Sequence, residues 1–406
     1  MLNKKICVVG LGYIGLPTAA LLATNGYDVA GIDLNHEVVN TINKGKIHIV
    51  EPDLDACVRS AVSLGKLRAY TKPQIADIYI ICVPTPFHPG EGIPQPNIDF
   101  VVSAAKSISM MLKEGDIVVL ESTSPVGTTR RIEEIFRNEG VATDKIHIAY
   151  CPERVLPGKI MTELVENDRV VGGLTPEATR KSSAFYKTFV RGKVLESDAA
   201  TAEMCKLAEN SYRDVNIAFA NELSLICSKS GIDVWKLIEL ANHHPRVNIL
   251  QPGTGVGGHC IAVDPWFIVA SDPGNARIIR TAREVNIRKT EWVISKIKSI
   301  ASEVTPKNGI NTRIACLGLS FKPDIDDLRE SPAMQIAMNL QELGFDIVAV
   351  EPNIQSHPSL GLTDIDFAIE SADVVAILVK HREFVHASRQ GALKGLILDF
   401  CGVGKH

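Results

Sequence analysis

The sequence predicts an α/β fold in which two doubly wound parallel sheets are joined by a long central helix. Short apolar, β-rich runs alternate with helix-like segments in the first 150 residues and again from residue 313 onward. Between them, residues 198–228 carry an uninterrupted helical periodicity. We therefore expect an N-terminal domain at 1–197, a central helical segment at 198–304 and a C-terminal domain at 305–406.

The first strand and its turn carry the clearest ligand signal. A strand at 5–9 leads into the pattern Gly-Leu-Gly-Tyr-Ile-Gly at 10–15 and then into a helix rich in Ala and Leu. Such glycines let the backbone approach a pyrophosphate that faces a helix N-terminus. A second strand at 28–32 ends at Asp33, which can bind the adenine ribose and repel a 2′-phosphate. The pattern predicts a Rossmann-like domain that prefers NAD to NADP, with a βαβ unit that binds nothing as the alternative.

Further apolar runs predict the other strands of this domain. They lie at 78–83, 117–120 and 146–150, with helices at 99–113 and 128–138 between them. Polar or proline-rich loops follow these strands, and ligands bind at the carboxyl edge of such a sheet. We therefore place Thr85, Thr123 and Glu153 near the cofactor and substrate, although each residue also suits an ordinary turn.

The central helix carries a polar stripe apart from its apolar one. Lys206, Asn210 and Arg213 lie at i, i+4 and i+7. A lysine and an asparagine one turn apart can deprotonate a hydroxyl and hold a water. A solvated helix face explains such a stripe equally well, so the pattern alone leaves both interpretations open.

Residues 251–267 form a glycine-rich stretch with four glycines in six positions, Gly253, Gly255, Gly257 and Gly258. His259 and Cys260 follow directly, and Asp264 lies four residues after Cys260. Glycines allow a ligand to approach the main chain, and a cysteine beside an acid is a candidate nucleophile. The alternative is a surface loop next to a buried structural thiol.

The C-terminal region repeats the α/β pattern. A polar segment with proline and glycine at 305–311 predicts a linker, and strands are predicted at 313–319, 346–350, 374–379 and 396–400. This second Rossmann-like domain lacks GxGxxG, so we expect a nucleotide sugar rather than a second dinucleotide. Lys322 and Arg329 in its first loop are candidate phosphate contacts, although four acids share that loop.

Composition excludes several classes of protein. Of 406 residues 45% are hydrophobic, which suffices for more than one core. A net charge of −4 and a pI near 6.3 provide no basic surface for nucleic acid or an anionic membrane. The nine cysteines, an odd number scattered through apolar runs, indicate reduced thiols rather than a disulfide framework. No CxxC pair among them suggests a metal site. Without a signal peptide or an apolar run of spanning length, we expect a cytoplasmic protein with no membrane partner.

Six motifs together are similar to those of the UDP-glucose/UDP-mannose dehydrogenase family, and the resemblance covers nearly the whole chain. They are Gly-Leu-Gly-Tyr-Ile-Gly-Leu-Pro at 10–17, Glu-Ser-Thr-Ser-Pro-Val-Gly-Thr at 121–128, Cys-Pro-Glu-Arg-Val-Leu-Pro-Gly at 151–158, Lys-Leu-Ala-Glu-Asn at 206–210, Gly-Val-Gly-Gly-His-Cys at 255–260 and Ser-Phe-Lys-Pro at 320–323. UDP-glucose members carry Cys-Phe-Pro-Lys-Asp where this chain has Cys-Ile-Ala-Val-Asp at 260–264. That difference, with His-Pro-Arg at 244–246, resembles the acetamido-sugar branch.

The resemblance implies an NAD-dependent, four-electron oxidation within polysaccharide biosynthesis. The C6 hydroxyl of UDP-N-acetyl-D-mannosamine would become the acid UDP-N-acetyl-D-mannosaminuronate through a thiohemiacetal and a thioester on Cys260. Covalent capture of the reactive aldehyde explains why a cysteine is needed, and its thiolate is the reactive form. The resemblance also implies a homodimer built on the central helices and no metal.

The resemblance also assigns site residues. The catalytic set would be Cys260 as nucleophile, Lys206 as acid/base, Asn210 and Asp264 to position water or the oxyanion, and Glu153 and Thr123 for proton transfer and hydrolysis. The cofactor would contact Gly10, Gly12, Tyr13, Ile14, Gly15, Asp33, Thr85, Thr123 and Arg329. The UDP-sugar would contact Arg154, Val155, Lys206, Asn210, Arg213, His244, Arg246, Gly257, Phe321 and Lys322.

One departure and three alternatives accompany this interpretation. Relatives end Asp-Thr-Lys/Arg-Gly, with the basic residue reaching the substrate, whereas Cys401 stands at that position here. A UDP-glucose or UDP-N-acetylglucosamine 6-dehydrogenase would share the same machinery. A two-electron NAD dehydrogenase would have no need of Cys260, and a nucleotide-sugar-binding protein without activity would not need Lys206 or Asn210 either.

Overall fold

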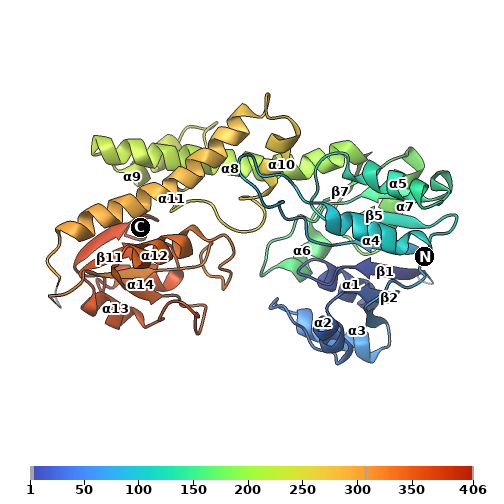
Figure 1. The fold of residues 1–406 in the computed structure, drawn as a ribbon, viewed down its shortest axis with the longest axis horizontal. Helices are drawn as coiled ribbons and strands as arrows, with labels where there is room; N and C mark the ends of the chain where they lie inside the picture. Colours follow the sequence, from blue (N-terminus) through green and yellow to red (C-terminus); the bar gives the residue numbers. More distant parts are fainter. Residues whose placement is uncertain (1–3, 307–308, 405–406) are drawn as a thin grey trace. The chain divides into compact units, whose positions relative to one another are not determined.

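The computed structural model describes residues 4–306 and 309–404 (Figure 1). Two compact units divide the chain: the first comprises 1–208 with 266–271, and the second comprises 209–265 with 272–406. Helix α8 (Ala199–Ser230), 32 residues long, contributes to both. The predicted α/β fold with two doubly wound sheets and a long central helix is confirmed, and the domain limits at 197 and 304 stay predictions.

The first unit contains an eight-stranded sheet in the order β3-β2-β1-β4-β5-β6-β7-β8. Its strands are β1 (Lys5–Val9), β2 (Asp28–Ile32), β3 (Leu67–Tyr70), β4 (Ile78–Ile81), β5 (Ile117–Leu120), β6 (His147–Tyr150), β7 (Arg169–Gly173) and β8 (Val194–Asp198). Neighbouring strands are parallel except β6 and β7, which pair antiparallel. Strand order reverses between β1 and β4, and the carboxyl ends at such a switch point form a ligand crevice.

Both faces of this sheet are covered by helices (Figure 1). These are α1 (Gly15–Thr24), α2 (His36–Asn43), α3 (Leu54–Ser63), α4 (Asp99–Ser109), α5 (Thr128–Asn138), α6 (Ile160–Glu166) and α7 (Pro176–Tyr186). Along β1, Ile6 and Val8 enter the core beneath α1, while Cys7 and Val9 enter the core beneath α4 and α5. A strand buried on both sides needs a continuous apolar sequence, which is why the periodicity revealed it.

The sequence did not predict β3, β7 or β8. β3 and β8 lie at the two edges of the sheet, and both have exposed positions. An edge strand needs no continuous apolar run, so the signal that revealed β1 is weak there. β7 is fully buried, but it opens with the charged Arg169 and ends in two glycines, which obscured it.

The second unit contains a four-stranded parallel sheet in the order β10-β9-β11-β12. Its elements are α9 (Val234–Ala241), α11 (Arg277–Glu303), β9 (Arg313–Leu317), α12 (Pro332–Glu342), β10 (Asp346–Val350), α13 (Ile365–Ser371), β11 (Val374–Ile377), α14 (Arg382–Arg389) and β12 (Leu396–Asp399). One face packs on α11 and α12 and the other on α13 and α14. The predicted linker at 305–311 includes residues 307–308, which lie outside the described residues.

Two findings bear on the class of protein. Among the residues that the structure describes, no helix is both long and apolar enough to span a membrane. The nine cysteines all lie within these residues and none is joined in a disulfide.

Candidate active site

The turn between β1 and α1 forms a cradle that is closed on one side and open on the other. A Cβ on Gly10 would lie 2.5 Å from the Cys82 carbonyl oxygen, and one on Gly15 would lie 1.8 Å from the Gly10 oxygen. A Cβ on Gly12 would meet no heavy atom of the described residues within 4 Å. The protein backbone therefore closes tightly behind the turn, and the space beside Gly12, at the N-terminus of α1, is left for an anionic ligand.

Asp33 lies at the carboxyl end of β2, next to this cradle. Its Oδ2 accepts a hydrogen bond from the Leu11 amide at 3.2 Å, and its Oδ1 accepts one from the Asn35 amide at 2.9 Å. The carboxylate is half-buried, so it is held in place while remaining accessible to a ribose. Tyr13 is exposed and Ile14 is half-buried in the same turn.

Two of the predicted site loops are joined to each other at the edge of the sheet. The Thr85 hydroxyl donates to the Thr123 carbonyl at 2.6 Å, which connects the loop after β4 to the loop after β5. Both side chains are half-buried. The structure therefore brings Thr85 and Thr123 together at the ends of neighbouring strands, and their proximity to a cofactor stays a prediction.

Glu153 belongs to a buried ionisable cluster that the sequence did not reveal. It forms an ion pair with Arg169, and both side chains are almost fully buried. Its Oε2 has no hydrogen-bond partner among the described residues. Nearby, Glu121 accepts a hydrogen bond from the Tyr186 hydroxyl at 2.6 Å and one from the Cys82 thiol at 3.2 Å.

The two carboxyl groups of this cluster differ in their partners. Burial, and next the charge of Glu153, raise the pKa of Glu121 to about 7. Glu121 therefore exchanges a proton near neutral pH, whereas Glu153 has the Arg169 guanidinium beside it. The sequence signal for Glu121 was its place at the end of a buried strand, but Arg169 gave none.

Lys206 and Asn210 are buried on α8, whereas Arg213 is exposed. The Asn210 amide donates to Asp264 Oδ2 at 2.6 Å, and Asp264 is the first residue of α10 (Asp264–Ser271). A buried lysine and asparagine do not form a solvated face, so that interpretation of the stripe is wrong for these two residues. For the exposed Arg213, a solvated helix face and a binding role both agree with the structure.

The glycine loop packs closely against the loop that follows β9. A Cβ on Gly257 would lie 2.3 Å from the Glu330 carbonyl oxygen, and one on Gly258 would lie 2.7 Å from the Phe321 ring. The Gly258 amide donates to the Arg329 carbonyl at 3.1 Å. No side chain fits at Gly257 or Gly258, because the Glu330 backbone and the Phe321 ring occupy the space. Glycine at both positions therefore allows the two loops to pack together.

Cys260 is exposed at the end of this loop, while the other eight cysteines are buried or half-buried. Its carbonyl accepts hydrogen bonds from the amides of Val263 and Asp264, at 3.1 and 2.8 Å, in the turn that leads into α10. An exposed thiol is not the buried structural thiol of the alternative interpretation. The structure therefore presents Cys260 four residues before Asp264, the partner of Asn210.

The remaining predicted site residues lie on loops. Of those assigned to the substrate, His244, Arg246 and Lys322 are exposed, and Arg154 and Val155 are half-buried. Arg329, assigned to the cofactor, is also exposed. Arg329 contacts Asp327 through two nitrogens, with its Nη2 at 2.6 Å from Oδ2. Cys401, which stands at the departure from the family pattern, is buried and donates to the Leu378 carbonyl at 2.9 Å. Burial raises the pKa of this thiol, so it stays neutral, and neither a thiol nor a thiolate supplies the positive charge of a lysine.

Comparison with known proteins accounts for almost the whole chain. Family models for the UDP-glucose/GDP-mannose dehydrogenase family match residues 4–190 as its NAD binding domain, 200–288 as its central domain and 315–405 as its UDP binding domain. The chain belongs to this family. The resemblance inferred from the motifs is thus confirmed. The family description names GDP-mannose, whereas the motif comparison named UDP-mannose.

Relatives of this member of the UDP-glucose/GDP-mannose dehydrogenase family cover nearly all of its length. The chain is 52% identical to a UDP-N-acetyl-D-mannosamine dehydrogenase of Yersinia pestis over 98% of this chain and 99% of that one. It is 50% identical to an NDP-N-acetyl-D-galactosaminuronic acid dehydrogenase of Ralstonia nicotianae, covering 98% and 96%. Its structure is similar to that of the UDP-N-acetyl-mannosamine dehydrogenase of Staphylococcus aureus, with a TM-score of 0.88, 40% identity and coverage of 99% and 95%.

Family membership makes the protein an NAD-dependent dehydrogenase that acts on a nucleotide sugar. This excludes the alternative of a binding protein without activity. The residues of the cradle fit NAD, because Gly10 and Gly15 admit no side chain while the space beside Gly12 stays open. The roles given to individual site residues stay predictions.

Proposed function

We propose that the protein oxidises the C6 hydroxyl of UDP-N-acetyl-D-mannosamine to the carboxylate of UDP-N-acetyl-D-mannosaminuronate. The observation that carries this proposal is the exposed thiol of Cys260 at the end of the glycine loop, beside the hydrogen-bonded pair Asn210 and Asp264. The choice of sugar is supported by relatives about half identical to this chain that are named UDP-N-acetyl-D-mannosamine dehydrogenase.

The cradle of the first unit would hold the cofactor. Gly10, Gly12 and Gly15 would surround the pyrophosphate, and Asp33 would bind the ribose. We also assign to the cofactor Tyr13, Ile14, Thr85, Thr123 and Arg329. When bound, NAD accepts a hydride from the carbinol carbon, and two equivalents are needed for each sugar.

The reaction then depends on groups of this chain. Lys206 takes the proton of the C6 hydroxyl as the alcohol becomes an aldehyde. The Cys260 thiolate adds to the aldehyde carbon, and the thiohemiacetal keeps the reactive aldehyde in the site. After the second oxidation, the same carbon is held as a thioester.

Hydrolysis completes the reaction. Asn210 and Asp264 hold the water that attacks the thioester carbon, and collapse of the tetrahedral intermediate breaks the carbon–sulfur bond. The carboxylate leaves and the Cys260 thiolate is regenerated. Glu153, whose Oε2 lacks a partner among the described residues, is available for proton transfer, together with Thr123.

The UDP-sugar would lie along the loops of 244–257 and 321–329. Guanidinium and ammonium groups are suited to the diphosphate because they donate charge-assisted hydrogen bonds to its oxygens. We assign to the substrate Arg154, Val155, Arg213, His244, Arg246, Gly257, Phe321 and Lys322, together with Lys206 and Asn210. Gly257 and Phe321 support this placement because they pack directly against each other.

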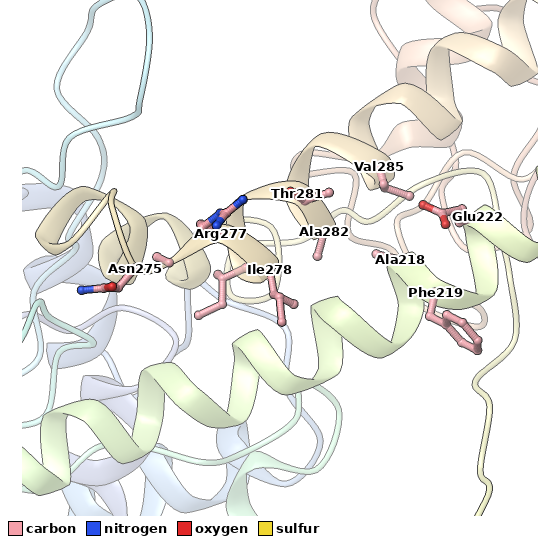
Figure 2. Close-up of a pocket in the computed structure, with 11 residues that line it drawn as sticks. Ala218, Phe219, Glu222, Asn275, Arg277, Ile278, Thr281, Ala282 and Val285 are labelled. Carbon is pink, nitrogen blue, oxygen red and sulfur yellow. The ribbon is translucent and has the colours of Figure 1, made fainter.

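We also propose that the protein forms a homodimer. In this dimer, a second copy of the chain packs into the groove between α8 and α11. Phe219 is 53% exposed and Ile278 is 73% exposed, although both are apolar. Figure 2 shows them on the two helices that border this groove, which has a volume of about 900 Å³. We expect Phe219→Glu to yield a monomer in analytical ultracentrifugation, and an unchanged mass would contradict this interface.

Substitution of Cys260 tests the proposed chemistry. In Cys260→Ser, turnover with UDP-N-acetyl-D-mannosamine should nearly vanish, while UDP-sugar and NAD still bind, because one atom changes. Cys57→Ser, at a half-buried thiol of the first unit, is the control and should leave turnover unchanged. A Cys260→Ser enzyme that turns over at the wild-type rate would overturn the thioester mechanism. Assays with UDP-N-acetylglucosamine and UDP-glucose, which should react poorly, decide the sugar.

A further inference from the structure

A chain of buried amides links helices α8 and α11 to the start of the loop that carries Cys260. Asn221, on α8, accepts a hydrogen bond from the Gly253 amide through its Oδ1 at 2.9 Å. Through its Nδ2 it donates to Oδ1 of Asn286, on α11, also at 2.9 Å. Both asparagine side chains are almost fully buried. The glycine loop therefore begins at a fixed polar contact rather than in free solvent.

An ion pair lies behind these amides and sets their direction. Asn286 Nδ2 donates to Asp214 Oδ1 at 2.8 Å, and Arg283 Nη1 donates to the same oxygen at 2.7 Å. An ionised carboxylate can only accept, so Asn286 must turn its nitrogen toward Asp214 and its oxygen toward Asn221. Asn221 must then present its own oxygen to the Gly253 amide. The charge pair thus selects one orientation for both amides.

The other end of the loop is held by the same helix. Asn210, about three turns before Asn221 on α8, donates to Asp264 at 2.6 Å. Between these ends, the Thr290 hydroxyl of α11 donates to the Thr254 carbonyl at 2.9 Å. Cys260 lies between the two points at which α8 holds the loop, so displacement of either end would move its thiol.

We infer that Asn221 and Asn286 are positioning residues for Cys260, oriented by Asp214 and Arg283. The inference rests on the proposed function, in which Cys260 is the nucleophile. A merely structural bridge between two helices would end on a helix or on a side chain. This one ends on the backbone amide of the catalytic loop, and removal of Asn221 leaves that amide without its acceptor.

The experiment compares Asn221→Ala with Asn216→Ala, a half-buried asparagine of α8 whose Nδ2 donates to the Tyr212 carbonyl of its own helix. In Asn221→Ala we expect kcat to fall roughly 10- to 100-fold with KM for NAD unchanged, because the thiol is misplaced and the cofactor cradle is untouched. The rate of Cys260 alkylation by iodoacetamide, followed by mass spectrometry without substrate, should change as well. Asn216→Ala should alter neither quantity.

A conservative variant separates positioning from packing. Asn221→Asp keeps an acceptor for the Gly253 amide and, with its carboxyl protonated, also a donor for Asn286 Oδ1, so it should recover part of the kcat lost in Asn221→Ala. If Asn221 served packing alone, the buried carboxylate introduced by Asn221→Asp would make that variant less active than Asn221→Ala. Should the Asn221 variants fail to fold, Thr290→Val removes one hydrogen bond to the loop at constant shape, and the same two readouts apply.

The outcomes keep this inference apart from the proposed function. An Asn221→Ala enzyme with wild-type kcat and wild-type alkylation rate would overturn the positioning role while leaving the role of Cys260 intact, and so would Thr290→Val with both values unchanged. Full turnover of Cys260→Ser would instead overturn the proposed chemistry. The alkylation rates would still show whether Asn221 sets the geometry of the thiol.

Discussion

The glycine turns that follow β1 and β9 begin alike. Gly10 has φ 94° and donates its amide to the Ile32 carbonyl at 2.8 Å, and Gly318 has φ 93° and donates to the Val350 carbonyl at 2.8 Å. In each sheet an acidic residue follows the neighbouring strand, Asp33 after β2 and Glu351 after β10. The same strand–turn–strand geometry has thus been built twice in one chain.

The two turns differ in what satisfies their amides. In the second unit Glu351 is buried, and its Oε2 accepts from the amides of Leu319 and Ser320 at 2.8 and 2.9 Å. The next helix, α12, begins only at Pro332, whereas α1 begins at Gly15, directly after the first turn. A carboxylate of the protein therefore occupies the place of an anionic ligand in the second sheet, and only the first turn combines open space with a helix N-terminus.

The largest effect expected from this comparison is on folding of the second sheet. A Cβ on Gly318 would lie 2.5 Å from the Val379 Cβ in addition to its positive φ. Gly318→Ala should therefore cost roughly 2–4 kcal/mol of stability, through steric clash and backbone strain. Urea unfolding measures this cost, with the NAD dissociation constant of the folded protein as the control. A weakened NAD affinity would show that the two turns are not independent.

The opposite pattern is expected at Gly12. A Cβ there meets nothing in the described residues, so Gly12→Ala should leave the unfolding midpoint unchanged. It should raise the NAD dissociation constant roughly 10- to 100-fold, because the methyl group takes space that the pyrophosphate needs. Isothermal titration calorimetry gives the constant, and Gly361→Ala, at another open glycine of the second unit, is the control. Unchanged NAD binding would place the cofactor elsewhere.

The acids after β2 and β10 should also differ in role. Asp33→Ala should improve NADP use relative to NAD by roughly tenfold, since one half-buried carboxylate no longer repels the 2′-phosphate. The ratio of kcat/KM for the two cofactors measures this, and Asp28→Ala, at the exposed start of the same strand, is the control. Equal use of both cofactors by the wild-type protein would count against Asp33 as the ribose ligand.

The smallest effect concerns pH. Each unit buries a glutamate near its first turn, but burial raises the pKa of Glu121 to about 7. For Glu351, burial acts in the same direction, yet hydrogen bonds from His381 and from the Leu319 and Ser320 amides outweigh it and lower the pKa to about 2. Between about pH 4.5 and 7, Glu121 is therefore protonated in the folded state but ionised in the unfolded state.

Stability contributed by Glu121 is therefore fully present below pH 4.5 and is lost as pH rises through 7. Between pH 6 and 8 the loss should be roughly 1 kcal/mol. Glu121→Gln should remove this dependence, which unfolding curves at several pH values will show. Glu351 contributes in the opposite sense, because its stabilisation is present above about pH 4.5 and is lost as pH falls toward 2. A wild-type protein whose stability rises from pH 6 to 8 would contradict the shift assigned to Glu121.

The sequence predicted those features that depend on local pattern. Strands buried on both faces, such as β1 and β5, carry continuous apolar runs, and the glycine turn at 10–15 follows from the backbone angles it needs. The polar stripe of α8 was recognised, but not that Lys206 and Asn210 are buried and Arg213 is exposed. Burial depends on what packs against a helix, which its own periodicity does not specify.

Long-range polar partners could not be predicted. Asn286 pairs with Asn221 across 65 residues, and Arg169 pairs with Glu153 across 16. Single polar residues within helices or strands have no spacing that identifies a partner. Cys401 was noticed because it departs from the family pattern, and the structure shows that its buried thiol donates a hydrogen bond to the Leu378 carbonyl.

The number of NADH molecules formed per sugar tests the central claim most directly. Wild-type protein is incubated with a limiting amount of UDP-N-acetyl-D-mannosamine and excess NAD, NADH is followed by its absorbance, and the product is identified by mass spectrometry. An open first cradle and an exposed Cys260 predict two NADH and a carboxylate for each sugar consumed. One NADH for each sugar, with an aldehyde or ketone accumulating, would contradict the account.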